Sequence, residues 1–316
     1  MRLKQLIDRA RLMLTAEYSD RRERDALVSS MVVDFLHLPG YAIVTDPFAD
    51  IPESDASAFL DCARRLSEGE PYQYITGWCE FGGRVFSVAP GVLIPRPETE
   101  YLCRLAGQKL RDSSLARQNL REHSSAGRLR ILDLCTGSGC IAWTLALDFP
   151  DAEVVGLDVS AQALDIACGQ FADCKTPGST PRSPRFAQCD ILRGPSATGG
   201  LKDWKDGASL ADFFAGPLDA IISNPPYVLD KERVLMRRNV LEHEPDLALF
   251  VPDCNPLLFY KAISDWALEL LRPGGLLLVE QNEALPAETA ALFSRFSRCE
   301  TVNDLSDKPR FTFAVR

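Results

Sequence analysis

Between residues 130 and 280 the chain alternates short apolar runs with amphipathic segments, and this alternation restricts the possible folds more than any other feature. It predicts strands at 130–134 and 153–157, strands ending near Asp190 and Ser223, and a strand at 275–280. It predicts helices at 139–148, 161–172 and 256–271. Such an alternation forms a mostly parallel sheet with helices on both faces, and ligands bind beyond the carboxyl ends of its strands. The predicted class is α/β.

The chain before this region has a different pattern. Apolar residues recur at helical spacing in residues 3–14 and 27–36, and a third helix is predicted from Ser54 to Gly69. Two β-prone runs around a Gly-Gly pair, in residues 78–88, predict a β-hairpin. The predicted domains are a helical bundle at 1–74, a hairpin connector at 75–93 and an α/β domain at 94–316.

Three segments interrupt the α/β pattern. They are rich in Ser, Gly, Pro or charged residues, and we expect surface loops without chemistry there. The segments are residues 111–127, 174–185 and 195–209.

Composition excludes several functions. The net charge of −9 argues against strong, sequence-independent binding to a nucleic-acid backbone. No apolar run reaches the roughly 18 residues of a membrane helix, and the charged N-terminus is unlike a signal peptide, so we expect a cytoplasmic protein without a membrane partner. The ten cysteines form no CxxC pair and the three histidines are dispersed, so no metal site is expected. No heptad repeat demands assembly, so we expect a monomer.

A glycine-rich turn follows the predicted strand at 130–134. In "ILDLCTGSGCIA" the residues Cys135, Thr136, Gly137, Ser138 and Gly139 lie between a strand and a helix. Glycines let the backbone approach a ligand, and the helix that follows directs its first N–H groups at that ligand. No third glycine follows, so the loop lacks the full GxGxxG pattern that cradles a pyrophosphate.

Acidic residues end the next two strands. Asp158 lies nineteen residues after Gly139, where a carboxylate accepts hydrogen bonds from ribose hydroxyls. Asp190 ends a third strand, where it could accept from an adenine amino group with Ile191 beside the ring; the alternative is a helix N-cap or a solvated acid. A nucleoside without phosphates fits this set, and we predict S-adenosylmethionine, with S-adenosylhomocysteine as the product.

"SNPPY", residues 223–227, ends the apolar run that begins at Leu218. Two prolines remove two backbone donors, so the sheet must stop there. If the Asn224 side-chain oxygen and the Pro225 carbonyl each accept one hydrogen of a planar NH2 group, the nitrogen is held for methyl transfer. Pro226 would stiffen the turn and Tyr227 would stack on the planar group. The alternative is a rigid turn without chemistry.

These motifs together carry a family resemblance. "NPPY" with "DLCTGSGCIA" resembles the amino-group methyltransferases, which act on adenine N6, guanine N2 or protein glutamine. "LIPRPETE" at 93–100 and "LEHEPDLAL" at 241–249 resemble segments of the HemK/PrmC family. That resemblance runs from about residue 70 to the C-terminus. It implies a Rossmann-like class I methyltransferase domain, and methylation of the glutamine side-chain nitrogen (N5) in the Gly-Gly-Gln motif of peptide chain release factors.

The resemblance also implies roles for single residues. Residues 224–227 would hold the glutamine, while residues 135–139, Asp158 and the region of Ile191 would hold the cofactor, which Asn224 would also contact. The helices at 1–74 would dock the release factor. The chain departs from the family at Cys135, where glycine is usual, and at Ile191, where an aromatic residue can occur.

The prolines of "IPRPETE" give a stiff segment that would present Arg96 and Glu98 to the substrate, and Glu100 would open a helix with its charge at the favourable end. The alternative is a rigid connector whose Arg96 is paired with the sheet.

Two other functions of the whole protein stay open at this point. One is a nucleic-acid amino methyltransferase, and the other is a binding module without activity.

Overall fold

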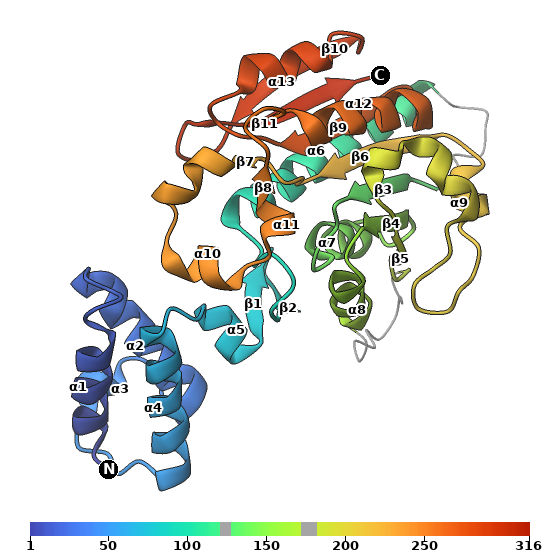
Figure 1. Cartoon of the computed structure of the whole chain (residues 1–316). Helices are drawn as coiled ribbons and strands as arrows, with labels where there is room; N and C mark the ends of the chain where they lie inside the picture. The colour runs from blue at the N-terminus through green and yellow to red at the C-terminus, as the bar shows by residue number, and fades with distance from the viewer. Residues whose placement is uncertain (121–127, 172–181) are drawn as a thin grey trace. The chain divides into compact units, whose positions relative to one another are not determined.

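The structure, a computed structural model, describes residues 1–120, 128–171 and 182–316. The chain divides into two compact units (Figure 1). The first comprises Met1–Trp78 together with Met236–Glu244, and the second comprises Cys79–Leu235 together with Pro245–Arg316. The predicted bounds at residues 74 and 93 stay predictions.

The first unit is helical. Its helices are α1 (Leu3–Leu14), α2 (Arg21–Leu36), α3 (Ala42–Thr45), α4 (Glu53–Ser67), α5 (Tyr72–Thr76) and α10 (Arg238–His243). The apolar residues that recur at helical spacing form its core, including fully buried Leu6, Val32 and Phe59. The three helices predicted from this spacing are present as α1, α2 and α4.

Helix α10 joins this unit although it lies more than 150 residues after α5. The Arg237 guanidinium, just before α10, forms an ion pair with Glu23 of α2. Arg238 lies 3.7 Å from the carboxylate of Glu17. The segment that follows the "NPPY" strand end therefore returns to the N-terminal helices before the chain re-enters the second unit.

The second unit contains the hairpin and the α/β fold. Its elements are β1 (Trp78–Phe81), β2 (Arg84–Ser87), α6 (Pro97–Leu120), β3 (Arg130–Leu134), α7 (Cys140–Asp148), β4 (Glu153–Asp158), α8 (Ala161–Gly169), β5 (Arg185–Gln188), η1 (Ile191–Arg193), η2 (Pro195–Gly200), α9 (Ala211–Phe214), β6 (Leu218–Ser223), β7 (Val228–Leu229), η3 (Asp230–Leu235), α11 (Asp246–Leu249), β8 (Phe250–Val251), α12 (Leu258–Leu270), β9 (Leu271–Glu280), α13 (Pro286–Leu292), β10 (Arg298–Asn303) and β11 (Pro309–Val315). None of the helices in the described part of the chain is long and apolar enough to cross a membrane.

Seven strands form one sheet in the order β10-β11-β9-β6-β3-β4-β5. Strands β9, β6, β3, β4 and β5 are parallel, while β11 runs antiparallel to both of its neighbours, β9 and β10. In the centre, Leu132 of β3 is paired with Val155 of β4 and Ile221 of β6. This order, with the antiparallel strand β11 inserted between β9 and the edge strand β10, is that of a Rossmann-like class I methyltransferase and confirms the predicted fold class.

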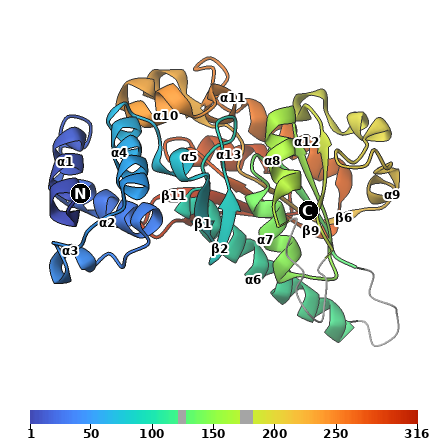
Figure 2. The same cartoon turned by 90° about the horizontal axis from the view of Figure 1, so that it is seen from below.

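Helices cover both faces of the sheet (Figure 2). On one face α9, α12 and α13 pack against side chains such as Leu134 and Leu277, and Trp266 of α12 is fully buried in the same apolar cluster. On the other face lie α6, α7 and α8. All six residues of β6 are buried, because a strand covered on both sides needs a continuous apolar run.

The prediction of loops was wrong for parts of the three interrupting segments. Residues 111–120 continue helix α6, because Leu, Ala, Arg and Gln in that stretch favour a helix more than its two serines oppose one. Residues 195–209 contain η2 and a bridge between Lys202 and Ser209. Arg185 begins β5. Residues 182–184 form neither helix nor strand, as predicted, while residues 121–127 and 174–181 lie outside the described residues.

Candidate active site

The turn between β3 and α7 uses the left-handed backbone region at Cys135 (φ 60°), Gly137 (φ 54°) and Gly139 (φ 78°). A Cβ at Gly139 would lie 3.0 Å from the Cβ of Ala167 and 3.2 Å from the ring of Phe186. A Cβ at Gly137 would meet none of the described atoms within 4 Å, and Gly137 lines a cavity. Gly139 therefore permits close packing of the turn on the fold, whereas Gly137 keeps space open for a ligand.

Cys135 adopts a left-handed backbone conformation that favours glycine. The left-handed region costs a residue with a Cβ about 1–2 kcal/mol. Burial raises the pKa of the Cys135 thiol well above its ordinary value, and the charge of Asp158 adds to this rise. Cys135 is therefore a neutral thiol that lines the cavity and also packs against the apolar core.

Asp133 holds the turn from inside. One carboxylate oxygen, Oδ2, accepts hydrogen bonds from the Thr136 hydroxyl at 2.5 Å and from the backbone N–H of Ala142 at 3.1 Å. The side chain is fully buried, and within the described residues its Oδ1 atom has no hydrogen-bond partner. Burial raises the pKa of Asp133 to about 7, although both hydrogen bonds oppose the rise.

Asp158 ends β4 at the rim of the cavity. Its Oδ2 atom accepts from the backbone N–H of Gly137 at 2.8 Å, and its Oδ1 atom accepts from the N–H of Ser160 at 2.9 Å. Each carboxylate oxygen has a second lone pair that can accept from a ligand hydroxyl. Burial raises the pKa of Asp158 above its ordinary value, and the backbone hydrogen bonds oppose this shift. The ribose role of Asp158 stays a prediction.

Asp190 and Ile191 follow the end of β5 and also line the cavity. The Oδ1 atom of Asp190 accepts from the N–H of Leu192 at 3.0 Å, so Asp190 caps the short helix η1. Ile191 is buried, and its carbonyl accepts from the indole N–H of Trp266 at 2.9 Å. The N-cap alternative for Asp190 is thus present, and its role toward adenine stays a prediction.

Asn224 follows the last residue of β6 and lines the same cavity. Its Nδ2 atom donates to the Thr99 hydroxyl at 2.8 Å. Thr99 lies in the first turn of α6 and donates in turn to Glu280 Oε2 at 2.8 Å. The Asn224 amide group is therefore held at its nitrogen end by a residue of the "LIPRPETE" segment.

Tyr227 is directed to the same glutamate. Its hydroxyl donates to Glu280 Oε1 at 2.8 Å, and its ring packs against the apolar core. Burial raises the pKa of Tyr227 well above its ordinary value, and the charge of Glu280 adds to this rise, so the hydroxyl remains a donor. Glu280 itself ends β9 and is 1% exposed.

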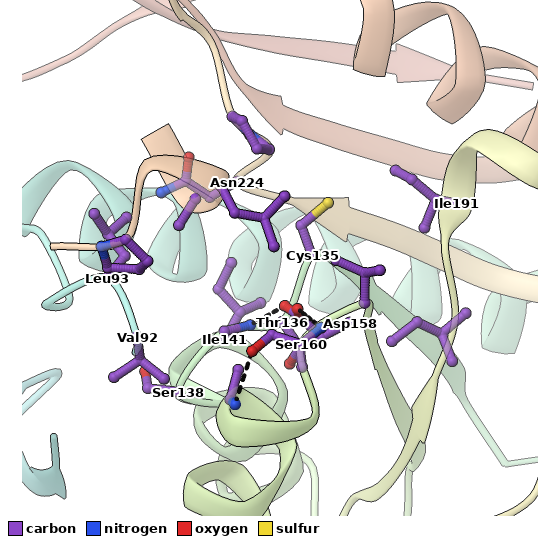
Figure 3. A pocket seen from close by; sticks show the side chains of 18 of the residues that line it. Val92, Leu93, Cys135, Thr136, Ser138, Ile141, Asp158, Ser160, Ile191 and Asn224 are labelled. Carbon is purple, nitrogen blue, oxygen red and sulfur yellow. Dashed lines mark hydrogen bonds between the residues drawn. The ribbon is translucent and has the colours of Figure 1, made fainter. Parts of the chain in front are cut away.

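The cavity has a volume of about 270 Å³ (Figure 3). Its walls come from the turn after β3, from the ends of β4, β5 and β6, and from the segment that leads into α6. Figure 3 shows Asn224, Cys135 and Asp158 around this space. These residues fit S-adenosylmethionine, because apolar walls such as Ile141 and Ile191 adjoin a few polar groups and Gly137 leaves room for close approach.

Most predicted site residues meet at this cavity. The predicted residues that line it are Cys135, Thr136, Gly137, Ser138, Asp158, Asp190, Ile191, Asn224 and Pro226. The cavity lining formed by the described residues does not include Gly139, Pro225, Tyr227, Arg96 and Glu98. Pro225 is buried, and Arg96 and Glu98 are half-buried. The substrate roles of these residues stay predictions.

Sequence reasoning missed Thr99 and Glu280. Thr99 lies between the two acids of "PETE" and drew no attention because a hydroxyl there fits an ordinary first helical turn. Glu280 follows the apolar run "LLLV", and an acid at a strand end was the signal used for Asp158 and Asp190. In the described part of the chain, no group of three or more His, Cys, Asp or Glu side chains could hold a metal ion.

The chain is similar to known proteins over nearly its whole length. Residues 5–77 match the family model described as the PrmC N-terminal domain. A release factor glutamine methyltransferase from Bacteroides thetaiotaomicron is 39% identical over 80% of this chain and 78% of that protein. The protein of the same name from Chlorobaculum tepidum is 38% identical over 81% of this chain and 78% of that protein. The one from Nitratidesulfovibrio vulgaris is 34% identical over 99% of this chain and 95% of that protein. This chain belongs to the release factor glutamine methyltransferase family.

Proposed function

We propose that this protein transfers a methyl group from S-adenosylmethionine to the side-chain amide nitrogen (N5) of a glutamine in peptide chain release factors. The target is the glutamine of their Gly-Gly-Gln motif. The observation that carries the proposal is the hydrogen bond from Asn224 Nδ2 to Thr99 in a cavity that also holds Asp158. With its nitrogen engaged, the Asn224 amide presents its oxygen as the acceptor for an incoming NH2 group.

The residues of the turn and the strand ends would hold the cofactor. Asp158 accepts from ribose hydroxyls, Ile191 contacts the adenine ring, and Gly137 lets the backbone approach. When bound, S-adenosylmethionine supplies an electrophilic methyl group. The chain itself supplies position rather than a strong base, because the amide proton becomes acidic only once the nitrogen carries the methyl group and then leaves to water.

Asn224 and Pro225 hold the target nitrogen. The Asn224 oxygen accepts one amide hydrogen and the Pro225 carbonyl accepts the other, which fixes the plane of the amide against the cofactor. Pro226, which lines the cavity, limits the freedom of this turn. Tyr227 covers the glutamine, while Arg96 and Glu98 contact the substrate beyond it.

A release factor is the partner that the relatives' names support, and the alternative of a nucleic-acid amino methyltransferase is not favoured. The helical residues of the first unit dock the release factor. The net charge of −9 supports a protein substrate without direct nucleic-acid contact. We also propose that the protein is a monomer and that it works in the cytoplasm, where release factors act.

The test is incubation of purified full-length release factor with this protein and S-adenosylmethionine, followed by mass spectrometry of the Gly-Gly-Gln peptide. We expect a mass gain of one methyl group on the glutamine with the wild type and none with Asn224→Ala. Calorimetric titration with S-adenosylhomocysteine shows in parallel that the variant still binds cofactor. An unmodified release factor after incubation with cofactor-binding wild type would contradict the proposal.

A further inference from the structure

A side-chain amide such as that of Asn224 has two ends of nearly equal shape, one an acceptor and the other a donor. Only the orientation with the oxygen toward the substrate could accept a hydrogen from the target NH2 group. The shape of a cavity cannot distinguish the two orientations. The choice must come from the hydrogen-bond partner at the far end of the group.

That partner is Thr99, and its hydroxyl by itself does not select the orientation of the Asn224 amide. A threonine hydroxyl has one hydrogen to donate and two lone pairs that accept, so it could bind either end of the Asn224 amide. In this structure the hydroxyl gives its hydrogen to Glu280 Oε2 at 2.8 Å. Only lone pairs then remain toward Asn224, and they accept from its Nδ2 atom at 2.8 Å.

Glu280 is placed to act only as an acceptor. Its Oε2 atom accepts from Thr99 and its Oε1 atom accepts from the Tyr227 hydroxyl, so one carboxylate binds Tyr227 directly and reaches Asn224 through Thr99. Burial raises the pKa of Glu280 above its ordinary value, whereas these two hydrogen bonds and the charge of Arg310 oppose the rise. Each carboxylate oxygen of Glu280 faces a hydroxyl that donates to it, so this geometry makes Glu280 the acceptor of both hydrogens.

We infer that Thr99 and Glu280 are positioning residues that fix the orientation of the Asn224 amide. Glu280 takes the Thr99 hydrogen, and Thr99 can then only accept from Asn224. This inference rests on the proposed function, since it assigns a task to Asn224 in that reaction. It also explains why the "PETE" segment begins α6 beside the strand ends. The helix start brings Thr99 between the carboxyl ends of β6 and β9.

The first test measures methyl transfer to the release factor by Thr99→Val, Thr99→Ser and Glu280→Gln. Valine keeps the shape but removes the hydroxyl, so we expect kcat to fall by about tenfold or more, with the KM for the release factor and the Kd for S-adenosylhomocysteine little changed. Serine keeps the hydroxyl and should restore most of kcat. Glutamine has a single acceptor oxygen for the two hydroxyls of Thr99 and Tyr227, so Glu280→Gln should also lower kcat.

The activity of a Thr99→Val, Glu280→Gln double variant shows whether Glu280 acts on Asn224 through Thr99 or independently of it. Because Glu280 acts on Asn224 through Thr99, the double variant should lose less activity than the two single losses combined. The matched control is Thr289→Val, which removes a buried hydroxyl in α13 that has no hydrogen-bond partner within the described residues. It should keep the wild-type kcat. A Thr99→Val variant with wild-type kcat would overturn the inference.

A second measurement needs no activity, so failure of the proposed function remains distinguishable from failure of this inference. The side-chain NH2 resonances of Asn224 are assigned by their loss in Asn224→Ala, and their hydrogen exchange is followed by NMR. One hydrogen should exchange slowly in the wild type and in Thr99→Ser, and faster in Thr99→Val and Glu280→Gln. Equal exchange in all four proteins would contradict the orientation device even where the release factor is methylated.

Discussion

The carboxylate of Asp158 accepts a hydrogen bond from the backbone N–H of Gly137 at 2.8 Å, which ties the end of β4 to the glycine-rich turn after β3. One side chain therefore shapes the turn and also faces the cavity. Because the two strands are neighbours in a parallel sheet, their carboxyl ends meet at one edge. Substitution of Asp158 should therefore lower the affinity for the cofactor more than it lowers the stability of the fold.

Asp158→Ala should weaken binding of S-adenosylhomocysteine by about 10-fold to 100-fold, the loss expected for hydrogen bonds to a charged acceptor. Calorimetric titration measures the Kd. The control is Asp151→Ala, which removes an exposed acid just before β4 and should leave the Kd unchanged. Equal affinity of wild type and Asp158→Ala would exclude a ribose role for this residue.

Asn224→Asp should abolish methyl transfer while cofactor affinity changes little. The new carboxylate has no hydrogen to give, and the Thr99 hydroxyl already donates its hydrogen to Glu280, so acceptors would face each other. Single-turnover assays with a saturating release factor measure the loss. Activity close to that of the wild type would show that the amide nitrogen of Asn224 has no part in positioning.

Two alanine substitutions in the glycine-rich turn should affect different properties, one mainly stability and the other mainly cofactor affinity. Gly139→Ala would add a Cβ at φ 78° and 3.0 Å from Ala167, so the free energy of unfolding should fall by about 1–3 kcal/mol. Gly137→Ala meets none of the described atoms within 4 Å, so it should cost stability less and cofactor affinity more. Urea unfolding and calorimetric titration of both variants measure this contrast, and a reversed order would contradict it.

Asp133 predicts a pH dependence of stability. Its pKa is raised from the ordinary 3.8 to about 7 by burial, so between these values the folded state binds the proton and the unfolded state does not. The free energy of unfolding contributed by Asp133 is therefore present below pH 3.8 and is lost as the pH rises toward 7.

Asp133→Asn mimics the protonated form and should remove this contribution. Urea unfolding in the absence of cofactor, repeated at several pH values, gives the free energies. The wild type should lose stability relative to Asp133→Asn as the pH rises through this window. A difference between the two proteins that stays constant with pH would show that the Asp133 carboxyl titrates normally in the fold.

The sequence predicted the elements that local pattern determines. Helices α1, α2, α4, α7 and α12 and the parallel strands lie close to where periodicity placed them, because amphipathic spacing and continuous apolar runs record which faces are buried. Strands β10 and β11 and helix α13 were not predicted. The helix after "LIPRPETE" was predicted only at its start, since its serine-containing second half has a weaker pattern.

The cavity could be predicted in outline for a similar reason. The carboxyl ends of parallel strands meet at one edge, so the residues after β3, β4, β5 and β6 had to be neighbours. What the sequence could not supply was the direction of each side chain. Tyr227 was predicted to cover a substrate, whereas its hydroxyl binds Glu280 and the cover role stays a prediction.

The sequence by itself thus determined the α/β class, the family and the glycine-rich turn that lines the cavity, because these depend on local spacing and backbone conformation. Only the tertiary structure brought Thr99 to Asn224, 125 residues apart, and Thr99 to Glu280, 181 residues apart. It also showed that α10 belongs with the N-terminal helices. Such partners are set by how strands and helices pack in three dimensions, and no local pattern along the chain records that packing.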